Sequence, residues 1–179
     1  MPTYVALLRS VNVAGHGRLA MADLQRSFRE IGHADVSTYI QTGNVIFRSA
    51  SRSASRLTTD IEEQLRVDFG QSPAVIIRTA DEMVRIAATS PYAKTGADAA
   101  RHHVTFLAAA PSKSVLAAFR PPPSGRDVLT IVGREVYVHT PDGYGNTKLN
   151  GSLLERRLHV VSTTRNWNTV RTLGELLGG

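Results

Sequence analysis

The sequence contains no cysteine, few aromatic residues and no apolar run of membrane-spanning length. The absence of cysteine excludes disulfide scaffolds, cysteine-ligated metal centres and thiol nucleophiles, and it fits the reducing cytoplasm that we expect for this protein. A transmembrane helix needs about 20 consecutive apolar residues, and the first residues are not those of a signal peptide, so we expect no membrane partner. What is present, 42% hydrophobic and 20% charged residues in a chain of 179, is typical of a globular fold.

Positive charge is in modest excess and is carried mainly by arginine. Lysine and arginine total 21 against 15 acidic residues, which gives a net charge of +6, and most of the excess lies after residue 90. Arginine binds phosphates and carboxylates through two parallel hydrogen bonds. The excess therefore fits an anionic partner, although a solvated basic face explains it equally well.

The first half of the sequence predicts the element order β-α-β-β-α-β. Alternating and continuous apolar segments predict strands over residues 3–9, 36–40, 45–47 and 74–77. Apolar residues at helical spacing predict helices over residues 21–31 and 59–69, the second starting at the capping box Thr59-x-x-Glu62 and ending at Gly70. This order is that of a ferredoxin-like fold.

The second half predicts a looser version of the same arrangement, with three strands. We expect strands over residues 104–109, 127–132 and 135–139, and helices over residues 79–89, 112–119, about 147–158 and 166–177. The first of these helices opens with the capping box Thr79-x-x-Glu82, Ser112 caps the second, and either Thr147 or Ser152 begins the third. The whole chain, residues 1–179, is predicted to be one compact domain, with an N-terminal half of about residues 1–78 and a C-terminal half of about residues 79–179.

Two polar segments of the first half are expected to meet at one edge of the sheet. The first leaves the first strand and includes Arg9 and Asn12; the second forms the turn of a hairpin and includes Gln41 and Asn44. In a β-α-β-β unit the end of the first strand and the tip of this hairpin lie at the same edge. These side chains could orient a small anionic or amide-bearing ligand, or they could simply complete their own turns.

A third polar segment opens the last predicted helix. Thr164 or Asn166 would cap the helix, which places free backbone amides beside the guanidinium of Arg165 and suggests an anion site. The single tryptophan, Trp167, could stack on a ligand ring or belong to the core. Lys148 follows a glycine-rich segment whose spacing does not match the Walker A motif. This mismatch favours an ordinary turn over a phosphate-binding loop.

Metal and cofactor chemistry finds no support in the sequence. The six histidines form no ligand motif, and without cysteine a metal site would need residues from distant segments, so we predict no metal and no cofactor. The nucleophile motif of the α/β-hydrolases is absent as well. His16 is the one histidine inside a polar segment, and the role of general base is the minor alternative for it.

The three polar segments together resemble the bacterial family known as domain of unknown function 1697. The matching segments run over residues 4–13, 38–45 and 163–167, and the resemblance covers essentially the whole chain. This sequence differs from the family pattern at Ser10, Val11, Ala14 and Thr42, where Gly, Ile, Gly and Ser are usual. The resemblance implies an α+β fold of two ferredoxin-like halves with antiparallel sheets packed together, and it implies no reaction.

These observations leave three hypotheses for the function. The first is a pocket for a small anionic ligand at one sheet edge between the halves, with or without catalysis. The second is binding of RNA or single-stranded nucleic acid through the arginine-rich half, with Tyr137 or Tyr144 as stacking rings; the third is a protein-interaction module without a ligand. The oligomeric state is not indicated by the sequence. The residues predicted to line the pocket are Arg9, Asn12, Tyr39, Gln41, Gly43, Asn44, Lys148, Arg165, Asn166 and Trp167.

Overall fold

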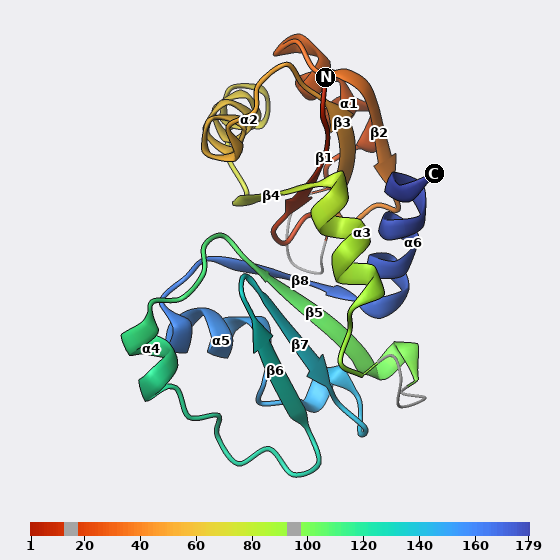
Figure 1. The fold of residues 1–179 in the computed structure, drawn as a ribbon. Helices are drawn as coiled ribbons and strands as arrows, with labels where there is room; N and C mark the ends of the chain where they lie inside the picture. The colour runs from red at the N-terminus through yellow and green to blue at the C-terminus, as the bar shows by residue number, and fades with distance from the viewer. Residues whose placement is uncertain (13–17, 93–97) are drawn as a thin grey trace. The chain divides into compact units, whose positions relative to one another are not determined.

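The computed structural model describes residues 1–12, 18–92 and 98–179, and the chain divides into two compact units (Figure 1). Unit 1 comprises Met1–Val84 together with Leu177–Gly179, and unit 2 comprises Arg85–Leu176. Each unit contains one four-stranded antiparallel sheet and has a βαββαβ-like order of elements. The fold is therefore α+β, as the sequence predicts.

Unit 1 contains the predicted β-α-β-β-α-β order, followed by the start of a third helix. Its elements are β1 (Thr3–Leu8), α1 (Met21–Glu30), β2 (Ala34–Tyr39), β3 (Asn44–Arg48), α2 (Ala54–Phe69), β4 (Val75–Thr79) and α3 (Ala80–Ala88). The strand order is β2-β3-β1-β4, and β1 pairs antiparallel with both β3 and β4. Because β1 lies inside the sheet, its residues are buried on both faces, which explains its nearly continuous apolar sequence.

Helices α1 and α2 cover one face of this sheet and share a core with it (Figure 1). The predicted stripe on α2 forms part of this core through Leu57, Ile61 and Leu65, each at most 1% exposed. Phe28 of α1 packs edge-on against Phe47 of β3, with ring centroids 5.2 Å apart. The apolar residues spaced three and four apart on each helix thus face the sheet, as expected for an amphipathic helix.

Helix α2 starts earlier than its capping-box motif predicts. Its N-cap is Ser53, whose side chain accepts a hydrogen bond from the Arg56 amide. Thr59 lies inside the helix and donates to the Ser55 carbonyl, while Glu62 accepts from the Val75 amide at 2.9 Å and so ties α2 to β4. The sequence does not indicate this earlier start because residues 49–56 contain no apolar residue larger than alanine to mark a first turn.

Helix α3 has the reciprocal capping box that its sequence predicts. The Glu82 amide donates to Thr79 Oγ1 at 3.1 Å, and the Thr79 amide donates to Glu82 Oε2 at 2.9 Å. Both contacts satisfy backbone donors that the helix itself cannot pair.

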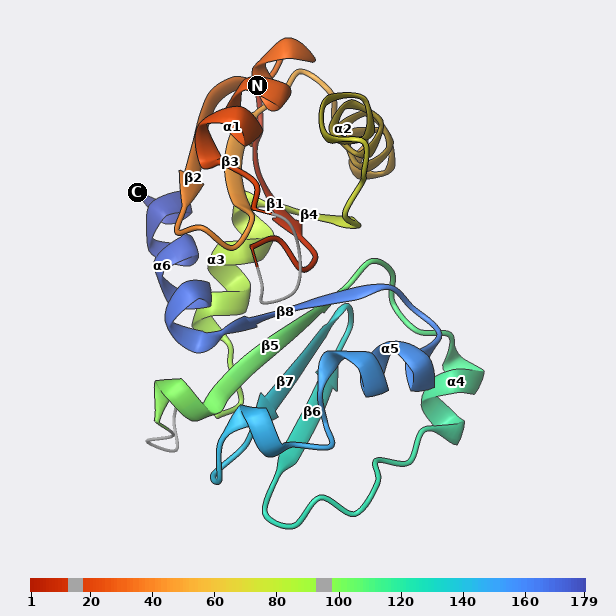
Figure 2. The ribbon, with the colours of Figure 1, turned by 180° about the vertical axis from the view of Figure 1, so that it is seen from behind.

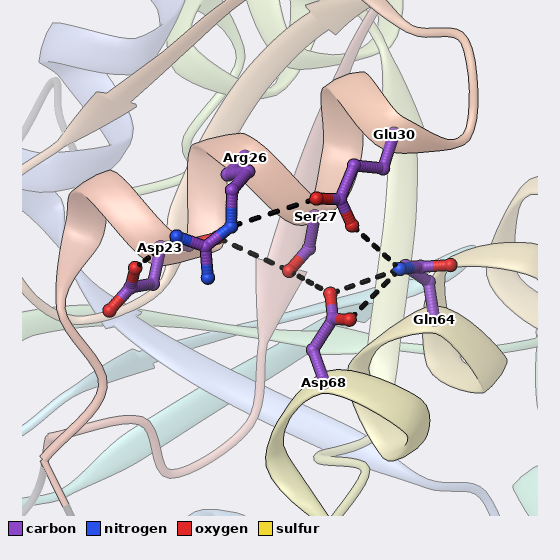
Figure 3. A network of polar contacts seen from close by, with 6 residues as sticks. All are labelled: Asp23, Arg26, Ser27, Glu30, Gln64 and Asp68. Atoms are coloured by element: carbon purple, nitrogen blue, oxygen red, sulfur yellow. Dashed lines mark hydrogen bonds and ion pairs between the residues drawn. The ribbon is translucent and has the colours of Figure 1, made fainter.

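A polar network joins α1 to α2 beside the core (Figure 3). Ser27 Oγ donates to Asp68 Oδ2 at 2.5 Å, and Gln64 Nε2 donates to both oxygens of Asp68 at 3.0 Å and to Glu30 at 3.1 Å. Arg26 adds ion pairs to Asp23 and Glu30 along α1. Ser27 is only 1% exposed, so this network holds the two helices together and offers no accessible nucleophile.

Unit 2 contains four strands, where the sequence predicts three. Its elements are β5 (His102–Leu107), α4 (Lys113–Ala118), β6 (Val128–Val132), β7 (Glu135–His139), α5 (Gly151–Leu158), β8 (Ser162–Asn166) and α6 (Trp167–Gly178), with 3₁₀ turns at Ala99–Arg101 and Tyr144–Asn146. The strand missed by the sequence is β8, which pairs antiparallel with β5. The strand order β6-β7-β5-β8 repeats that of unit 1, so the second half is a complete copy of the topology.

Helices α4 and α5 cover one face of this second sheet (Figure 2). Leu107, Val136 and Val138 meet Leu154 and Leu158 of α5 in a shared core. The predicted caps of two helices are confirmed: Ser112 accepts from the Val115 amide, and Asn166 Oδ1 accepts from the Thr169 amide.

The cap of α5 is Asn150, in place of Thr147 or Ser152, which the sequence suggested as alternative starts. Asn150 accepts a hydrogen bond from the Leu153 amide. Thr147 instead accepts from the Leu149 amide and donates to Asp127 at 2.6 Å.

In the part of the chain that the structure describes, no helix is both long and apolar enough to cross a bilayer.

Candidate functional site

The two polar segments of unit 1 meet at one edge of the sheet, as the topology predicts. Asn12 Nδ2 donates to the Gln41 carbonyl at 2.8 Å, across 29 positions of sequence. It also donates to the Leu19 carbonyl at 2.9 Å, and Asn12 Oδ1 accepts from the Leu19 amide at 2.6 Å. The Asn12 side chain therefore bridges the hairpin tip and the segment that leads into α1.

The hairpin turn uses Gly43 and Asn44 for its own geometry. Gly43 has φ 79°, and a Cβ built on it would lie 2.9 Å from Leu8 Cβ. Its carbonyl accepts from the Leu8 amide at 2.8 Å. Asn44 is 0% exposed and donates to the Tyr39 carbonyl and to Thr42 Oγ1. Both residues thus fix the turn against the end of β1, and a ligand has no access to the Asn44 amide in this conformation.

A cavity of about 370 Å³ opens beside this junction, within unit 1. We call it the Arg9–Arg18 cavity. Its basic residues are Arg9 and Arg18, and among the described residues its lining contains no acidic side chain. The remaining lining residues come from the end of β1, the lead-in to α1 and the α2–β4 connection: Ser10, Val11, Leu19, Phe69, Gln71, Ser72 and Pro73.

Of the predicted site residues, Arg9 lines this cavity and the others in unit 1 do not. Asn12, Gln41 and Gly43 form the adjacent junction, and Tyr39 ends β2, where it pairs with Asn44. The weak candidate His16 lies outside the described residues. Arg18, Gln71 and Ser72 were missed because they come from two connections that no sequence motif links.

In unit 2, Arg165 is a buried residue of β8 and does not precede the helix as a loop residue. It is 7% exposed, pairs with Val104 across the sheet, and donates to Thr163 Oγ1 at 2.8 Å and to the Thr164 carbonyl at 2.9 Å. Burial lowers the pKa of this guanidinium to about 10, so it stays charged at neutral pH.

Trp167 begins α6 and packs against a histidine. It is 5% exposed, and its ring stacks on His102 with centroids 4.5 Å apart and planes 21° apart. His102 in turn contacts Ser90 through Nε2 at 3.1 Å. Burial, together with the neighbouring histidines, lowers the pKa of His102 to about 4. This aromatic stack is a core feature of unit 2, which leaves little of the indole surface for a ligand.

Two further candidates of unit 2 are exposed, whereas the two candidate tyrosines are not free. Lys148 is exposed and follows the 3₁₀ turn Tyr144–Asn146, while Asn166 caps α6. Of the two tyrosines proposed for stacking on bases, Tyr137 is 2% exposed and Tyr144 stacks on His103 at 4.0 Å. Neither ring is presented as a free platform, although nucleic-acid binding stays an untested prediction, as does the interaction module.

Metal binding finds no site in the described part of the chain. No group of three or more histidine or acidic side chains there is arranged to hold a metal ion. In unit 1 the Arg9–Arg18 cavity supplies hydrogen-bonding groups and positive charge.

Comparisons with known proteins agree on the family and the fold. The conserved bacterial protein SP0830 from Streptococcus pneumoniae has a similar structure, with a TM-score of 0.76 at 22% sequence identity over 98% of each chain. At this identity the likeness concerns the fold. The comparison with curated proteins finds no match. The family model described as "Protein of unknown function (DUF1697)" matches residues 1–137, and the chain therefore belongs to the DUF1697 family.

Proposed function

We propose that this protein binds a small anionic ligand in the Arg9–Arg18 cavity of unit 1. The observation that carries the proposal is the charge of the lining: the described residues place two arginines and no carboxylate around about 370 Å³ of space. Arginine is suited to phosphate and carboxylate groups because its planar guanidinium donates two parallel hydrogen bonds.

The remaining lining supports a ligand with a non-charged part. Val11, Leu19, Phe69 and Pro73 supply apolar walls, and Ser10, Gln71 and Ser72 supply short polar groups. Small-molecule sites typically combine a mostly apolar lining with a few polar groups in about 300–1,000 Å³. The cavity lies at the lower end of this range, so a phosphorylated or carboxylated metabolite of small size fits it better than a dinucleotide.

The backbone at the cavity mouth is held in an uncommon conformation. Ser10 and Asn12 have φ of 56° and 53°, values that residues other than glycine adopt infrequently. Asn12 is fixed by three hydrogen bonds to Leu19 and Gln41. The hydrogen bonds of Asn12 thus fix the backbone next to the cavity lining, while Arg9 and Arg18 provide the positive charge.

The test compares two arginines of unit 1 in a thermal-shift and calorimetric screen against phosphate, sugar phosphates and dicarboxylates. Arg18→Ala removes an exposed cavity arginine; Arg52→Ala removes an exposed arginine outside the cavity and is the matched control. A ligand at 100 times its Kd adds about 2.7 kcal/mol, which raises the midpoint by about 5–10 °C in a chain of this size.

We expect such a shift in the wild type and in Arg52→Ala, and its loss in Arg18→Ala. The proposal is overturned if no anion stabilises the protein, or if the two variants lose the shift equally. The second result would indicate a general charge effect.

A further inference from the structure

We propose a second binding site, in unit 2, for a small carboxylate that carries a short apolar group. It is the pocket between α4 and α5, with a volume of about 200 Å³, which we call the α4–α5 pocket. It is a separate site from the Arg9–Arg18 cavity and does not depend on the function proposed for that cavity.

The lining of the α4–α5 pocket separates into an apolar wall and a basic rim. Val115, Ala118 and Phe119 form the wall, and Arg120, Arg157 and His159 form the rim. Ser114 completes the lining, and none of the described residues that line the pocket is acidic. This pairing of an apolar surface with uncompensated basic groups is complementary to an anion with an apolar part.

Two of the basic groups are placed for binding by their local structure. Arg120 Nη1 donates to the Ala117 and Phe119 carbonyls, at 2.8 and 2.7 Å, which holds the guanidinium at the end of α4. Its fixed position lowers the conformational entropy that binding would otherwise cost. Arg157 lies on α5 and, among the described residues, forms no ion pair or hydrogen bond through its side chain, so its charge is available to a ligand.

The third basic residue occupies a position that would favour glycine. His159 is the C-cap of α5, in the left-handed conformation with φ 56° and ψ 37°. Helix α2 also ends in a left-handed C-cap residue, and there it is Gly70 with φ 69°, the usual choice because glycine has no Cβ to clash. A histidine at this position strains the backbone, and strained residues gather at binding sites. Here the strained backbone conformation places the His159 imidazole on the pocket rim, where it can contact a ligand.

The pocket volume selects a small molecule as the occupant. About 200 Å³ is less than the typical space for a drug-sized ligand, which fits a short aliphatic or aromatic carboxylate and is too small for a folded partner to insert more than one side chain. We therefore assign a free carboxylate, with hexanoate as the probe.

The experiment is a titration of the full chain, followed by amide chemical shifts in two-dimensional NMR. Hexanoate is compared with hexanamide, which has the same apolar part without the charge, and with acetate, which has the charge without the apolar part. We expect hexanoate to shift the amides of residues 114–120 and 157–159, with affinities for hexanamide and acetate at least about tenfold weaker.

Neighbouring arginines on α5 provide the matched variants. Arg157→Ala, in the pocket lining, is expected to raise the Kd for hexanoate at least about tenfold; Arg156→Ala, an exposed arginine outside the lining, is expected to leave it unchanged. His159→Gly is expected to weaken binding while the thermal midpoint stays equal or rises, because glycine relieves the left-handed strain. That combination separates loss of a ligand contact from loss of the fold.

Equal binding of hexanamide, equal effects of the two arginine variants, or shifts outside the pocket would each overturn the assignment. Tighter binding of an acidic peptide, with shifts spreading beyond α4 and α5, would overturn it in favour of a protein-docking surface.

Discussion

At the scale of single residues, the edge of the sheet in unit 1 depends on close packing against a glycine. Gly43 has a positive φ and lies in close contact with two side chains. A Cβ built on it would lie 2.9 Å from Leu8 Cβ and 3.1 Å from Val11 Cβ. Val11 also lines the Arg9–Arg18 cavity. A change at Gly43 would therefore reach the cavity wall through Val11.

We expect Gly43→Ala to lower the free energy of unfolding by about 2–5 kcal/mol. A non-glycine residue in the left-handed region costs about 1–2 kcal/mol, and overpacking adds about 1–3 kcal/mol. Gly32→Ala is the control in the same unit, because Gly32 has φ 84° but no atom within 4 Å of a built Cβ; it should show the backbone cost alone. Urea unfolding measures both, and equal losses would refute the packing argument.

At the scale of elements, α1 and α2 are joined by the network of Figure 3 as well as by their apolar stripes. Hydrogen bonds from Ser27 and then from Gln64 lower the pKa of Asp68. Because the folded pKa lies below the unfolded one, this contribution to stability is fully present above the ordinary pKa near 3.8 and is lost as the pH falls through the folded value.

A double-mutant cycle of Ser27→Ala and Asp68→Asn measures this link between the helices. We expect a coupling of about 1 kcal/mol or more at pH 7, since a hydrogen bond to a charged group contributes more than a neutral one. The coupling should shrink below about pH 4, as Asp68 becomes protonated. A coupling near zero at pH 7 would show that the contact does not stabilise the helix pair.

At the scale of the whole molecule, unit 2 contains buried histidines that make its stability sensitive to acid. Burial lowers the pKa of His102 and of His103 to about 4. Between pH 6.5 and 4 the unfolded chain binds protons that these two rings do not bind when folded, so stability falls as the pH drops through this range.

Replacing one of these rings should reduce the acid sensitivity. His103 stacks on Tyr144, and its Nδ1 is buried without a hydrogen-bond partner among the described residues. His103→Phe keeps an aromatic ring and removes both the orphaned nitrogen and the proton uptake. We expect an unchanged or higher thermal midpoint at pH 7.5 and a smaller decrease on going to pH 5. An unchanged pH profile would show that His103 does not contribute to the acid response.

The first half of the fold follows closely from the sequence, and the second half less so, for a physical reason. In unit 1 the apolar periodicity is strong, and the topology alone brings Asn12 to Gln41. In unit 2, β8 has the sequence Ser-Thr-Thr-Arg-Asn, which lacks the apolar alternation of a strand. It forms because β5 offers a pairing edge, and because Thr163 Oγ1 and the Thr164 carbonyl accept hydrogen bonds from the buried Arg165. Such long-range pairing leaves no local signal.

The candidate sites were harder to predict than the strands. The Arg9–Arg18 cavity takes its lining from three segments that are brought together by the fold, and of the lining residues only Arg9, Ser10 and Val11 belong to a polar segment identified in the sequence. The α4–α5 pocket contains none of the predicted residues. Polar motifs at turns identified residues that fix the backbone through hydrogen bonds, such as Asn12 and Asn44. The position of exposed arginines beside a cavity depends instead on the tertiary structure.

The assignment of Leu177–Gly179 to unit 1 has a consequence for synthesis of the protein on the ribosome. A Cβ on Gly178 would lie 3.3 Å from Val84 Cγ2 of α3, so this end of α6 packs closely against the helix that follows β4. Domains fold as units from the N-terminus while the chain is being made, yet these three residues are translated after all of unit 2. We therefore expect the N-terminal unit to form its sheet and its first two helices before Gly178 reaches Val84, a contact that is made only after the intervening unit has been translated.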